Sequence, residues 1–159
     1  MDEPIEEREI RSLICESFPD YDTDAVCRIK TVVPTRTFLE KIFLLAEEFQ
    51  KDKPRSMRMS RHLYDLERLM DSDFGRSALA DKTLYDAIIE HRKAYYALKY
   101  VDYSLHSPDT INIVPPENVL DDWRQDYLNM QRYFIYGESL DFDQLMKRII
   151  ELQRRLRNM

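Results

Sequence analysis

The sequence is short of glycine and has no long apolar run. Only Gly75 and Gly137 occur among its 159 residues, whereas a sheet-rich fold with many tight turns needs more glycine. No apolar run approaches the ~18 residues that cross a membrane. The N-terminus reads Met-Asp-Glu-Pro and is acidic, unlike a signal peptide. We therefore expect a cytoplasmic, helix-rich protein that makes no membrane contact.

Cysteine is equally scarce. Cys15 and Cys27 are the two cysteines, each with apolar neighbours and without CxxC spacing. This pattern predicts buried thiols in a reducing cytosol. The three histidines, His62, His91 and His106, have no ligand spacing with one another or with the cysteines. The sequence therefore predicts no metal site.

A net charge of −6 argues against a generally basic nucleic-acid-binding surface. Residues 51–61 are a local exception, because they contain five cations and a single acid, Asp52. The cations are Lys51, Lys53, Arg55, Arg58 and Arg61. One interpretation is a solvated loop. The other is a phosphate-binding loop, because cations and free N–H donors meet at a helix N-terminus.

The apolar spacing predicts a mainly α fold, a bundle of about six helices with one short strand near residues 26–33. The helices are expected at residues 10–18, 34–53, 60–70, 81–100, 119–134 and 141–159, with residues 71–75 ending the third. We divide the chain into residues 1–33, a short helix plus an edge strand, and residues 34–159, the helical bundle.

Lys41 and Asp65 each admit two interpretations. Lys41 interrupts an otherwise apolar helix, so its side chain either reaches solvent along its aliphatic stem or points into a cleft. Asp65 lies between Arg61 and Arg68 at helical spacing, where an intrahelical ion pair is worth only a few tenths of a kcal/mol. Alternatively, Asp65 is a carboxylate held by these arginines beside the basic segment. An antiparallel helical hairpin would bring Lys41 and Asp65 to the same end.

Four tyrosines follow one another closely: Tyr95, Tyr96, Tyr100 and Tyr103. They are either a platform on which bases stack or, at helical spacing, part of the core and rim of the bundle.

Two segments together resemble a known family. Residues 33–41 read VPTRTFLEK, and residues 60–66, about twenty residues later, read SRHLYDL. This pair resembles the AbiEii/AbiGii nucleotidyltransferase toxin family. The tail agrees through Asp126-Tyr127, Met130, Phe134 and Gly137, so the resemblance runs from about Val26 to the C-terminus. Either segment alone is weakly specific, whereas the two together are fairly specific.

The resemblance implies a DNA-polymerase-β-like enzyme that uses Mg²⁺ to transfer a nucleotide from an NTP to an acceptor such as tRNA, and that has a cognate antitoxin. Lys41 matches the family's lysine that contacts the triphosphate, and Asp65 matches the aspartate that completes the active site. Four further residues are expected to bind substrate: Arg36, Arg61 and His62 within the same motifs, and Arg58 from the basic segment. Phosphoryl transfer depends on such charge neutralisation and fixed geometry.

The sequence also departs from the family pattern. Members carry an earlier Gly-Ser turn followed by a metal-binding Asp-x-Asp on a sheet, but here Gly75 precedes Arg76 and Gly137 precedes Glu138. We therefore expect no transferase activity from this chain alone. It would be a truncated gene product or one half of a split enzyme, with residues 1–33 at the junction of a missing nucleotidyltransferase core. The alternative is a non-catalytic helical module that binds a nucleotide, RNA or an antitoxin.

Overall fold

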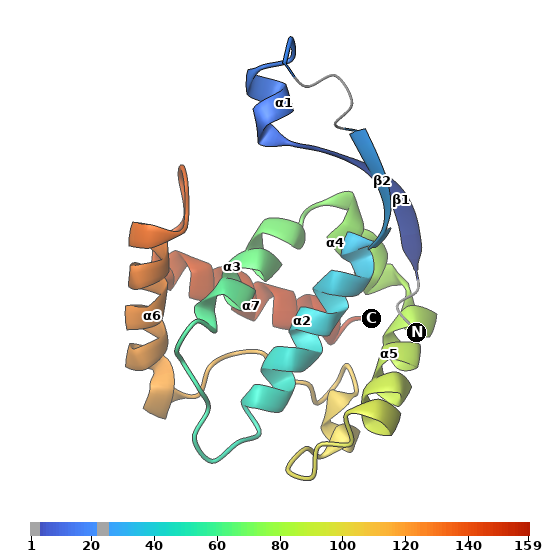
Figure 1. The fold of residues 1–159 in the computed structure, drawn as a ribbon. Helices are drawn as coiled ribbons and strands as arrows, with labels where there is room; N and C mark the ends of the chain where they lie inside the picture. Colours follow the sequence, from blue (N-terminus) through green and yellow to red (C-terminus); the bar gives the residue numbers. More distant parts are fainter. Residues whose placement is uncertain (1–3, 22–25) are drawn as a thin grey trace.

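The computed structural model describes residues 4–21 and 26–159, and within them it confirms the mainly α architecture (Figure 1). The elements, in chain order, are β1 (Ile5–Arg11), α1 (Leu13–Ser17), β2 (Val26–Val32), α2 (Pro34–Glu48), α3 (Ser60–Leu69), α4 (Asp73–Ala80), α5 (Lys82–Tyr95), α6 (Leu120–Tyr133) and α7 (Phe142–Leu156). Strand β2 lies where the single strand was predicted.

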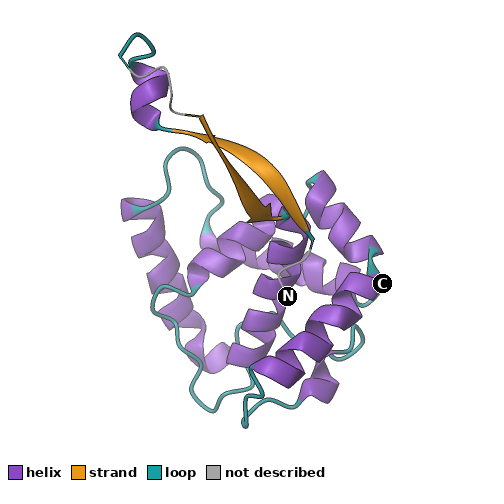
Figure 2. Ribbon diagram, turned by 45° about the vertical axis from the view of Figure 1, so that its right-hand side comes forward, coloured by secondary structure: helices purple, strands orange, loops and turns teal. Residues whose placement is uncertain are grey.

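A β-hairpin projects from the helical body, with α1 beyond its far end (Figures 1 and 2). Strand β1 pairs with β2 in an antiparallel register that sets Ile5 opposite Val32 and Arg11 opposite Val26. The predicted strand therefore has an antiparallel partner, β1, which the sequence analysis did not recognise. The expected helix at residues 10–18 is shorter, since Ser12 caps α1 by accepting a hydrogen bond from the backbone N–H of Ile14 at 3.1 Å.

The cysteine prediction fails on this arm. Cys27 is exposed and Cys15 is partly exposed, because the hairpin and α1 extend away from the helices that would cover them. In the part of the chain that the structure describes, no helix combines the length and hydrophobicity needed to cross a membrane.

Helix α2 supplies much of the core and carries several of the predicted site residues. Pro34 begins it, where the fixed φ of proline suits the first helical turn. Its apolar face is fully buried, and α3, α4 and α5 all pack against it. Helix α3 also packs against α6 and α7. The side chains that fill these contacts include Phe38, Ile42, Leu63, Leu66, Ile88, Trp123, Tyr127, Leu145 and Ile149.

Helix α4 was not predicted, because Gly75 was interpreted as part of the end of the preceding helix. Ser72 instead caps a new helix, accepting a hydrogen bond from the backbone N–H of Gly75 at 3.2 Å. A Cβ at Gly75 would lie 2.3 Å from the carbonyl oxygen of Leu69. The glycine therefore permits α4 to pack closely on the end of α3.

Candidate functional site

Lys41 and Asp65, the two predicted catalytic residues, form an ion pair between α2 and α3. The Lys41 Nζ lies 2.7 Å from Asp65 Oδ2, and the two side chains are 21% and 37% exposed. Lys41 therefore does not extend freely into solvent. Asp65 is held by a lysine of another helix rather than by an arginine of its own, so the pair connects two elements of the fold.

An open cavity of about 530 Å³ lies beside this pair. We call it the α2 groove, since α2 supplies five of its lining residues. The full lining is Val32, Arg36, Thr37, Glu40, Lys41, Leu44, His62, Arg92 and Tyr96. Its volume falls within the ~300–1,000 Å³ of typical ligand sites. The groove thus brings Arg36 and His62 to the place where Lys41 and Asp65 meet.

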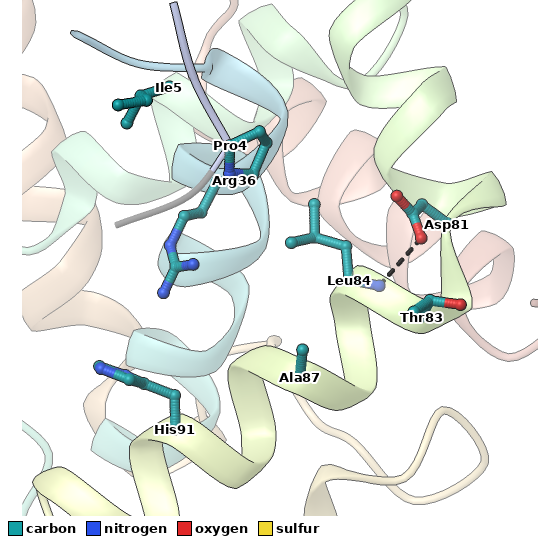
Figure 3. A pocket seen from close by; sticks show the side chains of 8 residues that line it. All are labelled: Pro4, Ile5, Arg36, Asp81, Thr83, Leu84, Ala87 and His91. Atoms are coloured by element: carbon teal, nitrogen blue, oxygen red, sulfur yellow. Dashed lines mark hydrogen bonds between the residues drawn. The ribbon is translucent and has the colours of Figure 1, made fainter. Parts of the chain in front are cut away.

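Arg36 lies between two cavities. Its side chain is nearly buried, and its Nη2 donates to Glu40 Oε1 at 3.2 Å, one helical turn further along α2. It also lines a second, larger cavity of about 870 Å³ at the base of the hairpin. Figure 3 shows the Arg36 side chain extending between Pro4 and His91 in this second cavity. The guanidinium is therefore within reach of either space.

His62 contributes a neutral ring to the α2 groove. Its side chain is nearly buried. Burial lowers the pKa of the imidazole to about 4, and the positive charges of Lys41 and Arg61 act in the same direction. Its Nδ1 is buried and makes no hydrogen bond with the described residues. A ligand near neutral pH would therefore meet His62 as an uncharged imidazole.

Arg92 forms one wall of the groove and connects α5 to α2. Its Nε and Nη2 donate to the two carboxylate oxygens of Glu47 at 2.8 and 2.6 Å, and its Nη1 donates to Glu40. Burial alone would lower the pKa of Arg92, but its bonds to these two carboxylates raise it above its ordinary value. The guanidinium also lies over the ring of Tyr96, 4.8 Å from its centroid.

The basic segment folds around two carboxylates of the protein itself. The first is Glu48, which accepts hydrogen bonds from Lys51 Nζ and from the backbone N–H of Arg55, both at 2.7 Å. Burial would raise the pKa of Glu48, but the hydrogen bonds from Arg55 and Lys51 lower it below its ordinary value. Two of the five cations, Lys51 and Arg55, therefore already share one carboxylate of the protein.

The second carboxylate, Asp126 of α6, occupies the N-terminus of α3. It accepts hydrogen bonds from the backbone N–H of Arg58 at 2.6 Å, and from the N–H and hydroxyl of Ser60 at 3.0 and 2.5 Å. Two backbone N–H donors at this helix start, on which the phosphate-loop interpretation partly rested, are thus taken by Asp126. Arg58 adopts a φ of 60°, a left-handed conformation that is uncommon for a residue with a side chain.

Arg58 and Arg61 lie away from the α2 groove. They line a separate cavity of about 390 Å³, together with Met57, Asp126, Asn129, Met130 and Phe134. Neither guanidinium has an ion pair or hydrogen bond with any residue that the structure describes. Of the six predicted site residues, four meet at one place and these two arginines do not.

Sequence reasoning missed Glu40 and Arg92 as parts of the groove. One signal was available for Arg92, because it follows Ile88 by four residues and so falls on the buried face of α5. A charged side chain on such a face needs a partner. Its partner on α2 could not be identified from the sequence of α5.

Residues 4–21 and 26–159 contain no group of three or more histidine, cysteine or acidic side chains arranged to hold a metal ion. In the groove, Asp65 is paired with Lys41, and Glu40 is paired with Arg36 and Arg92. These carboxylates of the groove are therefore already paired with cations of the protein. They do not fit the Mg²⁺ ions used by nucleotidyltransferases.

Residues 1–148 match the family described as nucleotidyl transferase AbiEii toxin, type IV toxin–antitoxin system. The chain belongs to the AbiEii family. The match confirms the resemblance seen in the sequence and also includes the hairpin arm, ahead of Val26. Membership implies a nucleotidyltransferase toxin with an antitoxin partner. No curated protein and no solved structure shows significant similarity to this AbiEii chain.

Proposed function

We propose that this chain supplies the triphosphate-binding part of an AbiEii nucleotidyltransferase site, with Lys41 contacting the phosphates of an NTP in the α2 groove. The observation that carries the proposal is the Lys41–Asp65 ion pair of 2.7 Å beside a cavity that Arg36 also lines. Phosphoryl transfer is governed mainly by positioning and charge stabilisation, which fixed cations provide.

Asp65 has two parts in this proposal. Without nucleotide, its carboxylate holds the Lys41 ammonium at the edge of the groove, which reduces the rotational freedom that the lysine would lose on binding. With nucleotide, the more highly charged triphosphate competes for the ammonium and leaves the carboxylate to complete the active site. Because neither glycine of the chain precedes a serine, the family's Gly-Ser turn with its metal-binding Asp-x-Asp would come from another segment. We therefore expect no transfer by the 159-residue chain alone. Robust Mg²⁺-dependent transfer by that chain would contradict this expectation.

Nucleotide binding tests the assignment of Lys41. We expect Lys41→Ala to weaken NTP affinity about tenfold to a hundredfold in isothermal titration calorimetry, because a charge-assisted hydrogen bond contributes about 1.5–3 kcal/mol. Lys82→Ala is the matched control. Lys82 also pairs with an aspartate, Asp86, at 2.9 Å, but it lies on α5 and does not line the α2 groove. Equal affinity of the wild type and Lys41→Ala would show that Lys41 is structural.

The separate cavity at Arg58 and Arg61 supports a binding site for the acceptor. Its two unpaired guanidiniums suit the phosphates of a single-stranded RNA end, and the exposed ring of Phe134 offers a surface for a base. We expect Arg61→Ala to weaken RNA binding in fluorescence anisotropy and to reduce its salt dependence, while NTP affinity is retained. Arg154→Ala is the control, because Arg154 is exposed on α7.

The same titrations distinguish the alternative functions. Binding of NTP or RNA with no transfer, even when the missing carboxylates are supplied in trans by a catalytic segment, would favour a non-catalytic binding module. Binding of neither would favour a helical module that docks an antitoxin.

A further inference from the structure

The α2 groove changes character along its length. Arg36 and Leu44 are eight residues apart on α2, which corresponds to about 12 Å at ~1.5 Å per helical residue. Arg36, Thr37, Glu40 and Lys41 make one part of the wall polar and charged, with two cations against one carboxylate, whereas Leu44 makes a later part apolar. A ligand that matches both parts has an anionic end and an apolar end.

Tyr96 adds an aromatic ring to this groove. It follows the last residue of α5 and is 54% exposed, although tyrosine rings elsewhere in the body, such as Tyr85, are fully buried. The ring is supported from one side, because the Arg92 guanidinium lies 4.8 Å from its centroid and is itself fixed by Glu47. Tyr96 therefore presents a braced and accessible aromatic surface.

The neighbouring tyrosines do not share this position. Tyr95 stacks on His91 with 4.5 Å between ring centroids, and the Lys51 Nζ lies 5.2 Å from the centroid of Tyr100. Neither Tyr95 nor Tyr100 lines the groove. A place for these tyrosines in the core is also excluded, since Tyr95, Tyr96 and Tyr100 are all exposed. Only Tyr96 among them combines an exposed ring with the cavity that holds Lys41.

We propose that Tyr96, together with Leu44, holds the nucleobase of the nucleotide whose phosphates contact Lys41. This inference rests on the proposed function and assigns the apolar part of the same groove. Every base has a π-face, so stacking on Tyr96 accepts different bases, and a purine covers more of the ring than a pyrimidine does. The groove therefore binds purine nucleotides more tightly than pyrimidine nucleotides and uses no fixed hydrogen-bond pattern at Tyr96 to choose between them.

Comparing ATP with inorganic tripolyphosphate separates base binding from phosphate binding. Tyr96→Ala should weaken ATP binding roughly fivefold to a hundredfold in isothermal titration calorimetry, the range that base–aromatic stacking produces. It should leave tripolyphosphate affinity unchanged. Tyr96→Phe keeps the aromatic face and should bind ATP like the wild type. Tyr95→Ala is the matched control, because Tyr95 immediately precedes Tyr96 and is exposed without lining the groove.

The outcomes of this comparison are distinct. If Tyr96→Ala binds ATP and tripolyphosphate as the wild type does, Tyr96 does not hold the base, although the phosphate assignment of Lys41 stands. If Tyr96→Phe loses as much ATP affinity as Tyr96→Ala, the hydroxyl and not the ring makes the contact, and stacking is refuted. If the wild type binds neither ligand, the proposed function fails and this inference fails with it.

Discussion

Replacing Arg92 by methionine is expected to destabilise the protein by about 3–5 kcal/mol, the cost of breaking a buried ion pair from one side. Arg92 and Glu47 are joined by two hydrogen bonds of 2.8 and 2.6 Å, and their side chains are only 8% and 5% exposed. Without the guanidinium, the Glu47 carboxylate stays buried and loses its counter-charge. In a chain of this length, the loss corresponds to a melting temperature about 6–20 °C lower.

The double variant Arg92→Met with Glu47→Leu provides the sharper test. Removing both charges eliminates the uncompensated carboxylate, so this variant should be more stable than Arg92→Met alone. Glu40 keeps its own bond to Arg36 at 3.2 Å in both variants. Urea unfolding followed by circular dichroism measures each free energy of unfolding.

Lys82→Met serves as the surface control for this cycle. The side chains of Lys82 and Asp86, which form an ion pair, are 63% and 55% exposed. Loss of this pair should therefore lower the free energy of unfolding by less than about 1 kcal/mol. A cost below about 1 kcal/mol for Arg92→Met, or a double variant whose cost equals the sum of the two single variants, would refute the reasoning.

Three further substitutions or titrations address other features. In an NMR titration, the His62 ring should stay neutral down to a pH of about 4. An unfolded histidine titrates near ~6.5. The folded state therefore keeps its full stability above that pH and loses stability as the pH falls from ~6.5 towards 4, because the unfolded state binds a proton that buried His62 does not. His62→Gln should flatten the pH dependence of the unfolding free energy between these two pH values. Asp126→Asn should lower the free energy of unfolding by about 1–3 kcal/mol, measured in urea, because it weakens the hydrogen bonds at the start of α3. The control Asp122→Asn changes an exposed residue and should alter the free energy of unfolding by less than about 0.5 kcal/mol. Equal effects of the two substitutions would contradict the role of Asp126. Gly75→Ala should destabilise by about 1–3 kcal/mol, since its Cβ would lie 2.3 Å from Leu69 O, and an unchanged melting temperature would exclude that close contact.

Elements with local signals were predictable from the sequence. Pro34 marked the start of α2, and Asp141 caps α7 in a capping box with Gln144, as expected of a helix that begins near residue 141. Strand β1 was missed because its identity depends on pairing with a strand about twenty residues later in the chain. Helix α4 was missed because Gly75 was interpreted as a helix end. The glycine is instead required by the close approach of α4 to the backbone of Leu69, which no local sequence pattern reveals.

The candidate site was predictable only in part. The sequence motifs selected Lys41 and Asp65, but their meeting depends on how α2 and α3 pack. The basic segment shows the limit more clearly, because the carboxylate that occupies the start of α3 belongs to Asp126, 66 residues beyond Ser60. Charge counting within residues 51–61 could not reveal a partner so distant in the sequence.

The hairpin arm has a consequence for the cooperativity of the fold. Its strands bury almost none of their side chains, so it contributes little to the hydrophobic core. A two-stranded hairpin without further support is at best marginally stable in water. The amide hydrogens between β1 and β2 should therefore exchange with solvent through local opening of the hairpin. This opening should be much more frequent than unfolding of the helical body. We therefore expect the arm to open as a separate cooperative unit while α2 to α7 stay folded.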